Sequence, residues 1–76
     1  MDSVEQLVAG IWADILRVPD VSACDNFFDL GGHSLLASQV VARLEKELGL
    51  RMKSKELAFQ TLRQFASSCR ERMQAQ

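Results

Sequence analysis

Apolar residues recur every three or four positions in three stretches of the chain, 4–16, 34–48 and 61–73. This spacing is typical of amphipathic helices that turn one face toward a core. No stretch alternates apolar and polar residues with a period of two, so nothing predicts a sheet. The pattern predicts an all-α fold: a small four-helix bundle of three main helices plus one short helix, with a long ordered loop between the first and second helices.

The first predicted helix covers residues 4–16, with Ser3 as its expected N-cap. It should end near Arg17, because Pro19 disfavours helical backbone at Val18. The expected outward positions are Gln6, Ala9, Ala13 and Arg17. The expected core-facing positions are Val4, Leu7, Val8, Ile11, Trp12, Ile15 and Leu16. Trp12 belongs to a continuous apolar stripe and is therefore interpreted as core rather than as a ligand platform.

Residues 18–33 form a long connection for so small a chain, and such loops either pack against the core or serve a function. The apolar residues expected to anchor it are Val21, Phe27, Phe28 and Leu30. The second helix should run from Ser34 or Leu35 to Leu48, with Gly49 as its stop. Its expected inward face is Leu36, Ala37, Val40, Val41, Leu44 and Leu48. Leu35 falls instead on the polar side.

The remaining third of the chain predicts a short element and the last helix. Leu50 and Met52 should reach back to the core, and Ser54 is expected to cap a short turn that carries Leu57 and Phe59. Thr61 and Gln64 then form the T-x-x-Q pattern of a capping box. The residues that the last helix should bury are Leu62, Phe65, Ala66, Cys69 and Met73.

The composition is that of one small globular domain, residues 1–76, with 47% hydrophobic and 25% charged residues. No apolar run approaches the ~20 residues of a membrane span and no signal-peptide pattern is present, so the chain is expected to be cytoplasmic. Cys24 and Cys69 are expected to be reduced, small buried residues. The net charge of −1 is uneven, since residues 49–76 carry six bases and two acids. These bases are interleaved with an apolar stripe, which favours a solvated helix face over a nucleic-acid site.

The candidate site is the stretch 25–36, which holds adjacent glycines, the only histidine and a serine at the start of a helix. Gly31 and Gly32 allow positive φ or a close approach to the backbone. Ser34 is expected to be the N-cap of the second helix, beside unpaired N–H groups that favour an anion. By itself such a serine would be an ordinary cap, but capping requires neither the two glycines nor His33. The stretch is therefore interpreted as built to present one hydroxyl.

The sequence does not support a serine hydrolase site or a metal site. A G-x-S-x-G nucleophile elbow requires a glycine where Leu36 stands and a preceding strand. His33 is adjacent to Ser34 and is poorly placed to act as its general base. One histidine and two distant cysteines lack the spacing of metal ligands, so no metal site is predicted. Asp25 and Asp29 are expected to be turn formers or caps.

Residues 25–36 resemble the signature of the peptidyl carrier (thiolation, phosphopantetheine-binding) domains of nonribosomal peptide synthetases, F-F-x-L-G-G-H/D-S-L/I. The matching residues are Phe27, Phe28, Leu30, Gly31, Gly32, His33, Ser34 and Leu35. The resemblance extends more loosely over nearly the whole chain and implies the four-helix layout of that family. One departure is Gln60-Thr61, where the family often has Pro-Thr before its last helix, and the missing proline leaves the start of that helix less firmly specified.

The resemblance implies that Ser34 receives 4′-phosphopantetheine and that the chain is a carrier rather than an enzyme. The implied cargo is an aminoacyl or peptidyl thioester. The implied partners are a phosphopantetheinyl transferase, an adenylation domain, and condensation, tailoring or thioesterase domains, with no nucleic acid or membrane and with the chain a monomer. Leu35, expected to be exposed beside Ser34, is predicted to contact these partners. It would alternatively fold back onto Phe27 or Phe28 as core.

Two alternatives remain open at this point. One is an unmodified helical protein-interaction module, and the other is an acyl or aryl carrier in polyketide or siderophore-type assembly. The identity of the cargo is not readable from the sequence.

Overall fold

A computed structural model describes residues 2–75, with the side chains of residues 2–74, as three main helices and one short 3₁₀ helix. In chain order these are α1 (Ser3–Leu16), α2 (Ser34–Leu48), η1 (Ser54–Leu57) and α3 (Leu62–Ala75). The only β-type pairing in this part of the chain is an isolated bridge between Asn26 and Thr61. The predicted all-α bundle is confirmed.

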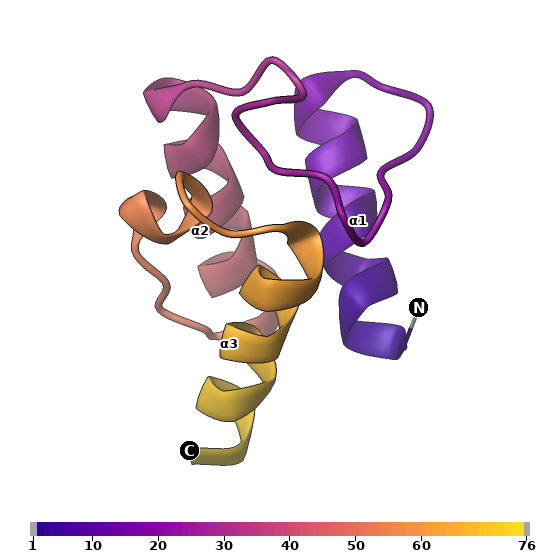
Figure 1. The fold of residues 1–76 in the computed structure, drawn as a ribbon. Coiled ribbons are helices and arrows are strands. Elements are labelled where there is room, and N and C mark those ends of the chain that lie inside the picture. Colours follow the sequence, from indigo (N-terminus) through magenta and orange to yellow (C-terminus); the bar gives the residue numbers. More distant parts are fainter. Residues whose placement is uncertain (1, 76) are drawn as a thin grey trace.

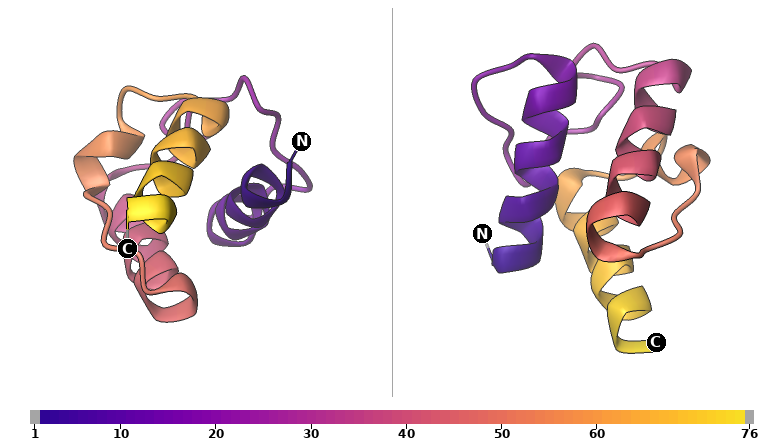
Figure 2. Two further views of the ribbon diagram at one scale, coloured as in Figure 1. Left: turned by 90° about the horizontal axis from the view of Figure 1, so that it is seen from below. Right: turned by 180° about the vertical axis from the view of Figure 1, so that it is seen from behind.

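The helices are arranged so that α2 begins at the end of the molecule where the long loop lies (Figure 1). The start of α1 and the end of α3 lie toward the other end, and the view from behind shows α1 and α2 side by side (Figure 2). α1 packs against both α2 and α3, and α2 packs against η1. The loop is thus carried across one end of a three-helix frame.

The predicted helix boundaries hold, but the residue that caps α1 differs from the prediction. Asp2, rather than Ser3, is the N-cap: its carboxylate accepts from the N–H of Glu5 at 2.8 Å, and the Glu5 carboxylate accepts from the N–H of Asp2. The C-cap of α1 is Arg17, in the left-handed conformation with φ 57°, and the C-cap of α2 is Gly49. The N-cap thus lies one residue before the predicted Ser3, and the capping box with Glu5 was not predicted.

A single core lies between the helices. The buried apolar residues are Val8, Ala9, Ile11, Trp12, Val21, Phe27, Ala37, Val40, Leu44, Leu50, Met52, Leu57, Leu62, Phe65, Ala66 and Cys69. At its centre the Trp12 ring meets Phe27 edge to face, with ring centroids 5.2 Å apart, and Phe65 lies 5.9 Å from Trp12. Such aromatic contacts join α1, the loop and α3 beyond simple area burial.

Three helical residues face the opposite side from the one predicted. In α1, Ala9 is buried and Leu7 is 37% exposed, which reverses both predictions. In α3, Met73 is exposed rather than buried. The two errors in α1 follow from its packing on two helices at once, because the face that a helix buries depends on its neighbours.

The two thiols have different environments. Cys24 lies exposed in the loop, which corrects the prediction that it is buried, whereas Cys69 is buried in α3. Both are free, as predicted. Burial raises the pKa of the Cys69 thiol to about 11, so it stays protonated near neutral pH and acts as a small core residue.

No helix in the described part of the chain is long and apolar enough to cross a membrane.

Candidate functional site

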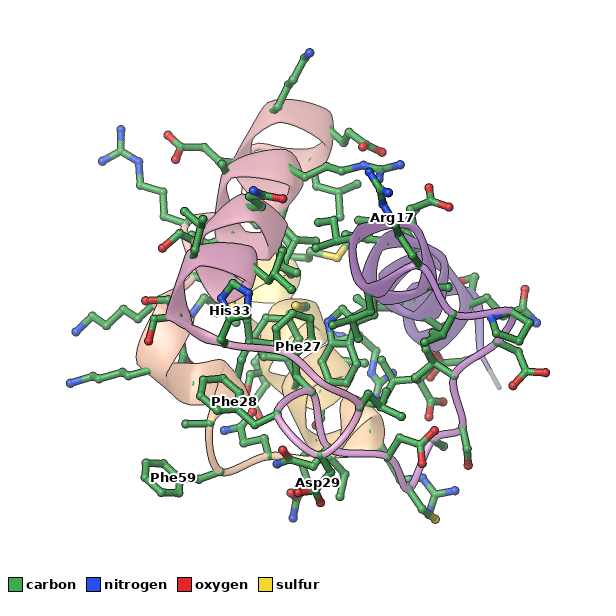
Figure 3. All side chains as sticks on the ribbon, turned by 90° about the horizontal axis from the view of Figure 1, so that it is seen from above. Arg17, Phe27, Phe28, Asp29, His33 and Phe59 are labelled. Carbon is green, nitrogen blue, oxygen red and sulfur yellow. The ribbon has the colours of Figure 1, made fainter. Side chains whose placement is uncertain are left out.

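The loop before α2 is folded by its own turns. The side-chain oxygen of Asn26 accepts from the N–H groups of Phe28 at 2.9 Å and Asp29 at 3.3 Å. The carbonyl of Asn26 accepts from Leu30 N–H, and that of Phe28 accepts from Gly31 N–H. This Asx-type turn bends the chain at residues 26–31, and the adjacent Phe27 and Phe28 lie within the bend. Phe27 points into the bundle, as expected, whereas Phe28 points outward and is 38% exposed, so Phe28 is not the anchor that we expected (Figure 3). The other two expected anchors are confirmed, since Val21 is buried and Leu30 packs against the core.

The two adjacent glycines are required for different reasons. Gly31 has φ 98°, a conformation that residues with a Cβ rarely adopt. Gly32 lies against Phe27: a Cβ at this position would lie 2.7 Å from the Phe27 carbonyl oxygen and closer still to its ring. The N–H of Gly32 donates to that same carbonyl at 3.1 Å. The glycines therefore bring the chain close over Phe27 and direct it into α2.

Ser34 is the first residue of α2 rather than its N-cap, which corrects the prediction. The N-cap is His33, whose backbone is extended and whose side chain makes no capping hydrogen bond. The carbonyl of His33 accepts from Ala37 N–H at 2.8 Å. In the described part of the chain, no hydrogen bond engages the Ser34 hydroxyl, and Ser34 is exposed. This hydroxyl is consequently presented to solvent.

The first three backbone N–H groups of α2, on Ser34, Leu35 and Leu36, also have no acceptor among the described residues. The first turn contains no acidic side chain. Unpaired N–H groups at the start of a helix carry partial positive charge and bind phosphate well. The start of α2 therefore combines a free hydroxyl with an environment that favours an attached anion.

Leu35 lies beside this hydroxyl and is 64% exposed. The predicted exposure of Leu35 is confirmed, and the alternative of Leu35 as core is wrong. Phe59, which follows η1, is 88% exposed and lies on the same side of the molecule as Phe28 and His33 (Figure 3). Exposed apolar side chains therefore lie in the first turn of α2 (Leu35) and beside it (Phe28).

A groove of about 270 Å³ opens directly beside Ser34. Its lining residues are Phe28, Ser34, Ala37, Ser54, Lys55 and Ala58. The residues contributed by η1 and its end were not identified from the sequence, because they lie at least 20 positions from Ser34 in the chain. Only the packing of α2 against η1 brings them to the site.

Asn26, which joins the loop to the segment before α3, was not identified from the sequence. Its side-chain amide donates to the carbonyl of Gln60 at 3.1 Å and that of Ala58 at 3.4 Å. An asparagine in a loop signals a turn, but nothing in the local sequence indicates partners more than 30 residues away.

The start of α3, left less firmly specified by the missing proline, is well defined. Thr61 and Gln64 form the predicted capping box, with 2.9 Å from Thr61 N–H to the Gln64 side chain and 3.3 Å from Gln64 N–H to the Thr61 hydroxyl.

The phosphopantetheine attachment site family model matches residues 6–69. The chain belongs to this family. The group that the family carries, 4′-phosphopantetheine, fits the start of α2, where a free hydroxyl stands beside three open N–H donors and a groove.

Relatives and solved structures place the chain among peptidyl carriers within this family. Tyrocidine synthase 2 of Brevibacillus parabrevis is 52% identical over 54 residues, which are 71% of this chain and 2% of that protein. Surfactin synthase subunit 1 of Bacillus subtilis (strain 168) is 45% identical over 56 residues, 74% of this chain and 2% of that protein. The chain thus spans only a small fraction of the length of these curated relatives.

Among solved structures, the complex of the phosphopantetheine transferase Sfp with coenzyme A and a peptidyl carrier protein matches with a TM-score of 0.89 and 34% identity, covering 95% of each chain. A peptidyl carrier domain described as a prototype for modular peptide synthetases matches with a TM-score of 0.75 and 37% identity, covering 88% of this chain and 90% of that one. The fold is that of a peptidyl carrier domain.

Proposed function

We propose that residues 1–76 act as one peptidyl carrier domain in nonribosomal peptide synthesis, with 4′-phosphopantetheine attached to the hydroxyl of Ser34. The observation that carries the proposal is the free, exposed Ser34 hydroxyl at the uncapped start of α2. It lies within the region matched by the phosphopantetheine attachment family.

The chain's contribution to attachment is to present a nucleophile and to favour the product. The Ser34 oxygen forms a bond to the phosphorus of coenzyme A that carries the pantetheine, and the bond from that phosphorus to the adenosine bisphosphate breaks. A transferase supplies the base and the divalent cation. The phosphodiester left on Ser34 carries a negative charge beside the open N–H groups of Ser34, Leu35 and Leu36, where the helix dipole stabilises it.

When bound, the group supplies a terminal thiol on which an aminoacyl or peptidyl unit is held as a thioester. The domain then raises the effective concentration of this tethered unit at each partner active site. In this proposal the chain performs no catalysis itself. A single hydrophobic core supports its treatment as one domain.

The proposed partners follow from the relatives and the surface. A solved complex pairs a similar carrier with the transferase Sfp, and another solved chain combines an adenylation domain with a carrier. An adenylation domain, and condensation, tailoring or thioesterase domains, would act on the loaded arm, with the domain itself a cytoplasmic monomer. Leu35, 64% exposed beside Ser34, is the proposed apolar contact for these partners.

Intact-mass spectrometry after incubation with coenzyme A, Mg²⁺ and a promiscuous transferase tests the attachment. The wild-type chain should gain one phosphopantetheine, and Ser34→Ala should gain none. Ser38→Ala is the matched control, because Ser38 lies one turn along α2 and its hydroxyl donates to the Ser34 carbonyl at 3.1 Å. Modification of Ser34→Ala, or loss of modification in Ser38→Ala alone, would contradict the assignment.

A folded wild-type chain that gains no mass with any transferase would instead support an unmodified interaction module. Loading of the modified chain by adenylation enzymes for aryl or acyl acids, and by none for amino acids, would support the acyl or aryl carrier.

A further inference from the structure

The groove beside Ser34 has three walls from different parts of the chain. The loop contributes Phe28, α2 contributes Ser34 and Ala37, and η1 with the residue after it contributes Ser54, Lys55 and Ala58. Figure 3 shows Phe28 directed outward toward the η1 side, near His33 at the start of α2. The attachment serine is therefore itself part of a concave surface.

The lining of the groove is divided in chemical character. Phe28 and Ala58 offer apolar surface, and Ala37 lies fully buried beneath the groove. Lys55 offers an ammonium group that forms no ion pair with the described residues. The adjacent acid, Glu56, is engaged elsewhere, since its carboxylate lies 3.2 Å from Arg72 and accepts from Lys53 N–H at 2.8 Å. An anion near Lys55 would thus meet an uncompensated positive charge.

Hydrogen bonds connect the opposite walls of the groove. Asn26 ties the loop that bears Phe28 to the carbonyl of Ala58, on the opposite wall, and to Gln60. The N–H of Ala58 in turn donates to the Lys55 carbonyl at 3.2 Å. Walls fixed in this way lower the ordering cost of binding.

The size of the groove limits its occupant. Pockets that enclose a whole drug-sized ligand have about 300–1,000 Å³. At about 270 Å³ the groove is smaller than that range. It suits one section of a flexible arm, not an entire arm with its cargo.

We propose that the groove binds the phosphate-proximal section of the phosphopantetheine arm, an inference that rests on attachment at Ser34. Lys55 pairs with the phosphodiester, and the two methyl groups of the pantoyl unit pack on Phe28 and Ala58, above the buried Ala37. The arm begins on the wall of the groove, so its binding there is intramolecular and needs little affinity. The thiol end stays outside, accessible to partners.

Docking of this kind is reversible and depends on salt. Lys55 is exposed, and the attraction between exposed charges weakens as the Debye length shortens from about 8 Å at physiological ionic strength to about 3 Å at 1 M salt. Raising the salt concentration should therefore release the arm without unfolding the domain.

The test uses the modified chain, with attachment first verified by intact mass and an isotopically labelled pantetheine arm. Nuclear Overhauser effects should connect the pantoyl methyl protons with the methyl groups of Ala37 and Ala58. Backbone amides of residues 54–58 should shift between the unmodified and modified chains. The contacts to the pantoyl methyl protons decide the question, because residues 54–58 lie beside Ser34 across the groove and their amides also respond to the attached charge alone.

Lys55→Gln should reduce the shifts at residues 54–58 by more than half and weaken the contacts to the pantoyl methyls. Lys46→Gln is the matched control, because Lys46 is also exposed but lies in the last turn of α2. It should leave both signals unchanged. Neither substitution touches the core, so both variants should fold.

An arm that is attached but shows no contacts to Ala37 or Ala58 would overturn this inference and leave the attachment intact. Equal responses of the Lys55→Gln and Lys46→Gln chains would overturn the role of Lys55. A chain that gains no mass at all would instead overturn the proposed function.

Discussion

The starts of α2 and α3 differ in whether their first backbone N–H groups have hydrogen-bond acceptors. Every helix begins with backbone N–H groups that its own turns cannot satisfy. In α3 the first three are all occupied: Leu62 donates to the Asp25 carbonyl at 2.8 Å, Arg63 to the Ala23 carbonyl at 3.0 Å, and Gln64 to the Thr61 hydroxyl. In α2 the corresponding groups have no acceptor in the described chain.

This difference separates a structural helix start from a functional one. The start of α3 joins the loop to the bundle, and its donors are used up in doing so. The start of α2 keeps its donors available beside Ser34, where a phosphate would accept from them. α1 also has a side-chain cap, since the Asp2 carboxylate accepts from Glu5 N–H. Among the three main helices described, α1 and α3 have a side-chain cap, and α2, which bears the candidate hydroxyl, has none.

The largest expected effect on stability comes from the glycine that leads into α2. Gly32→Ala should destabilise the domain by about 1–3 kcal/mol, because the added Cβ would overlap the Phe27 carbonyl. Gly10→Ala is the matched control in α1, where nothing lies within 4 Å of the added atom, and it should stabilise the domain by about 0.5–1 kcal/mol. Urea unfolding measures both, and equal effects would contradict the close approach at Gly32.

Removing the hydroxyl at each helix start should have unequal costs. Thr61→Ala should cost about 0.5–2 kcal/mol, because the Thr61 hydroxyl caps α3. Ser34→Ala should change stability by no more than about 0.5 kcal/mol, because the Ser34 hydroxyl caps nothing. The comparison is made by thermal and urea unfolding of the unmodified chains. A Ser34→Ala cost as large as that of Thr61→Ala would mean that Ser34 caps α2 in solution.

Two exposed leucines test whether the surface at the start of α2 is functional. Leu35→Ala should slow transferase modification roughly fivefold, as expected if truncation removes an apolar anchor worth about 1 kcal/mol. Leu7→Ala, on α1, should leave the modification rate unchanged, and both should keep a nearly unchanged thermal midpoint. A lower midpoint for Leu35→Ala with an unchanged rate would assign Leu35 to the fold.

The smallest effect concerns pH and the charged cap of α1. The N–H of Glu5, which donates to the Asp2 carboxylate, holds the pKa of Asp2 below its ordinary value of 3.8. The stabilisation by Asp2 is therefore full above that ordinary value and is lost as the pH falls through the lower folded value. Asp2→Asn keeps an acceptor without a titrating group, so its thermal midpoint should fall less than that of the wild type between pH 7 and about pH 3. Equal acid sensitivity of the two chains would count against this role of the Asp2 charge.

The sequence by itself determined the helices and the contacts between residues within about one helical turn of each other. Repetition of apolar residues every three or four positions specifies a helix locally, so α1 and α2 were predicted to within one residue at each end, and α3 was predicted from its start. The Thr61 and Gln64 pair and the Gly49 stop were readable for the same reason. The string of residues from Phe27 to Leu35 likewise indicated the family and the candidate serine.

Only the tertiary structure decided which groups meet across the chain. The exchange of Leu7 and Ala9 between surface and core follows from the packing of α1 against two helices. The hydrogen bonds of Asn26 to residues 32 and 34 positions away, and the placement of Lys55 in the groove beside Ser34, follow from the way the loop and η1 pack. Local patterns fix backbone conformation because helical hydrogen bonds span four residues. The partners of a loop side chain, or of a free helix start, are set by segments that come together only when the core forms.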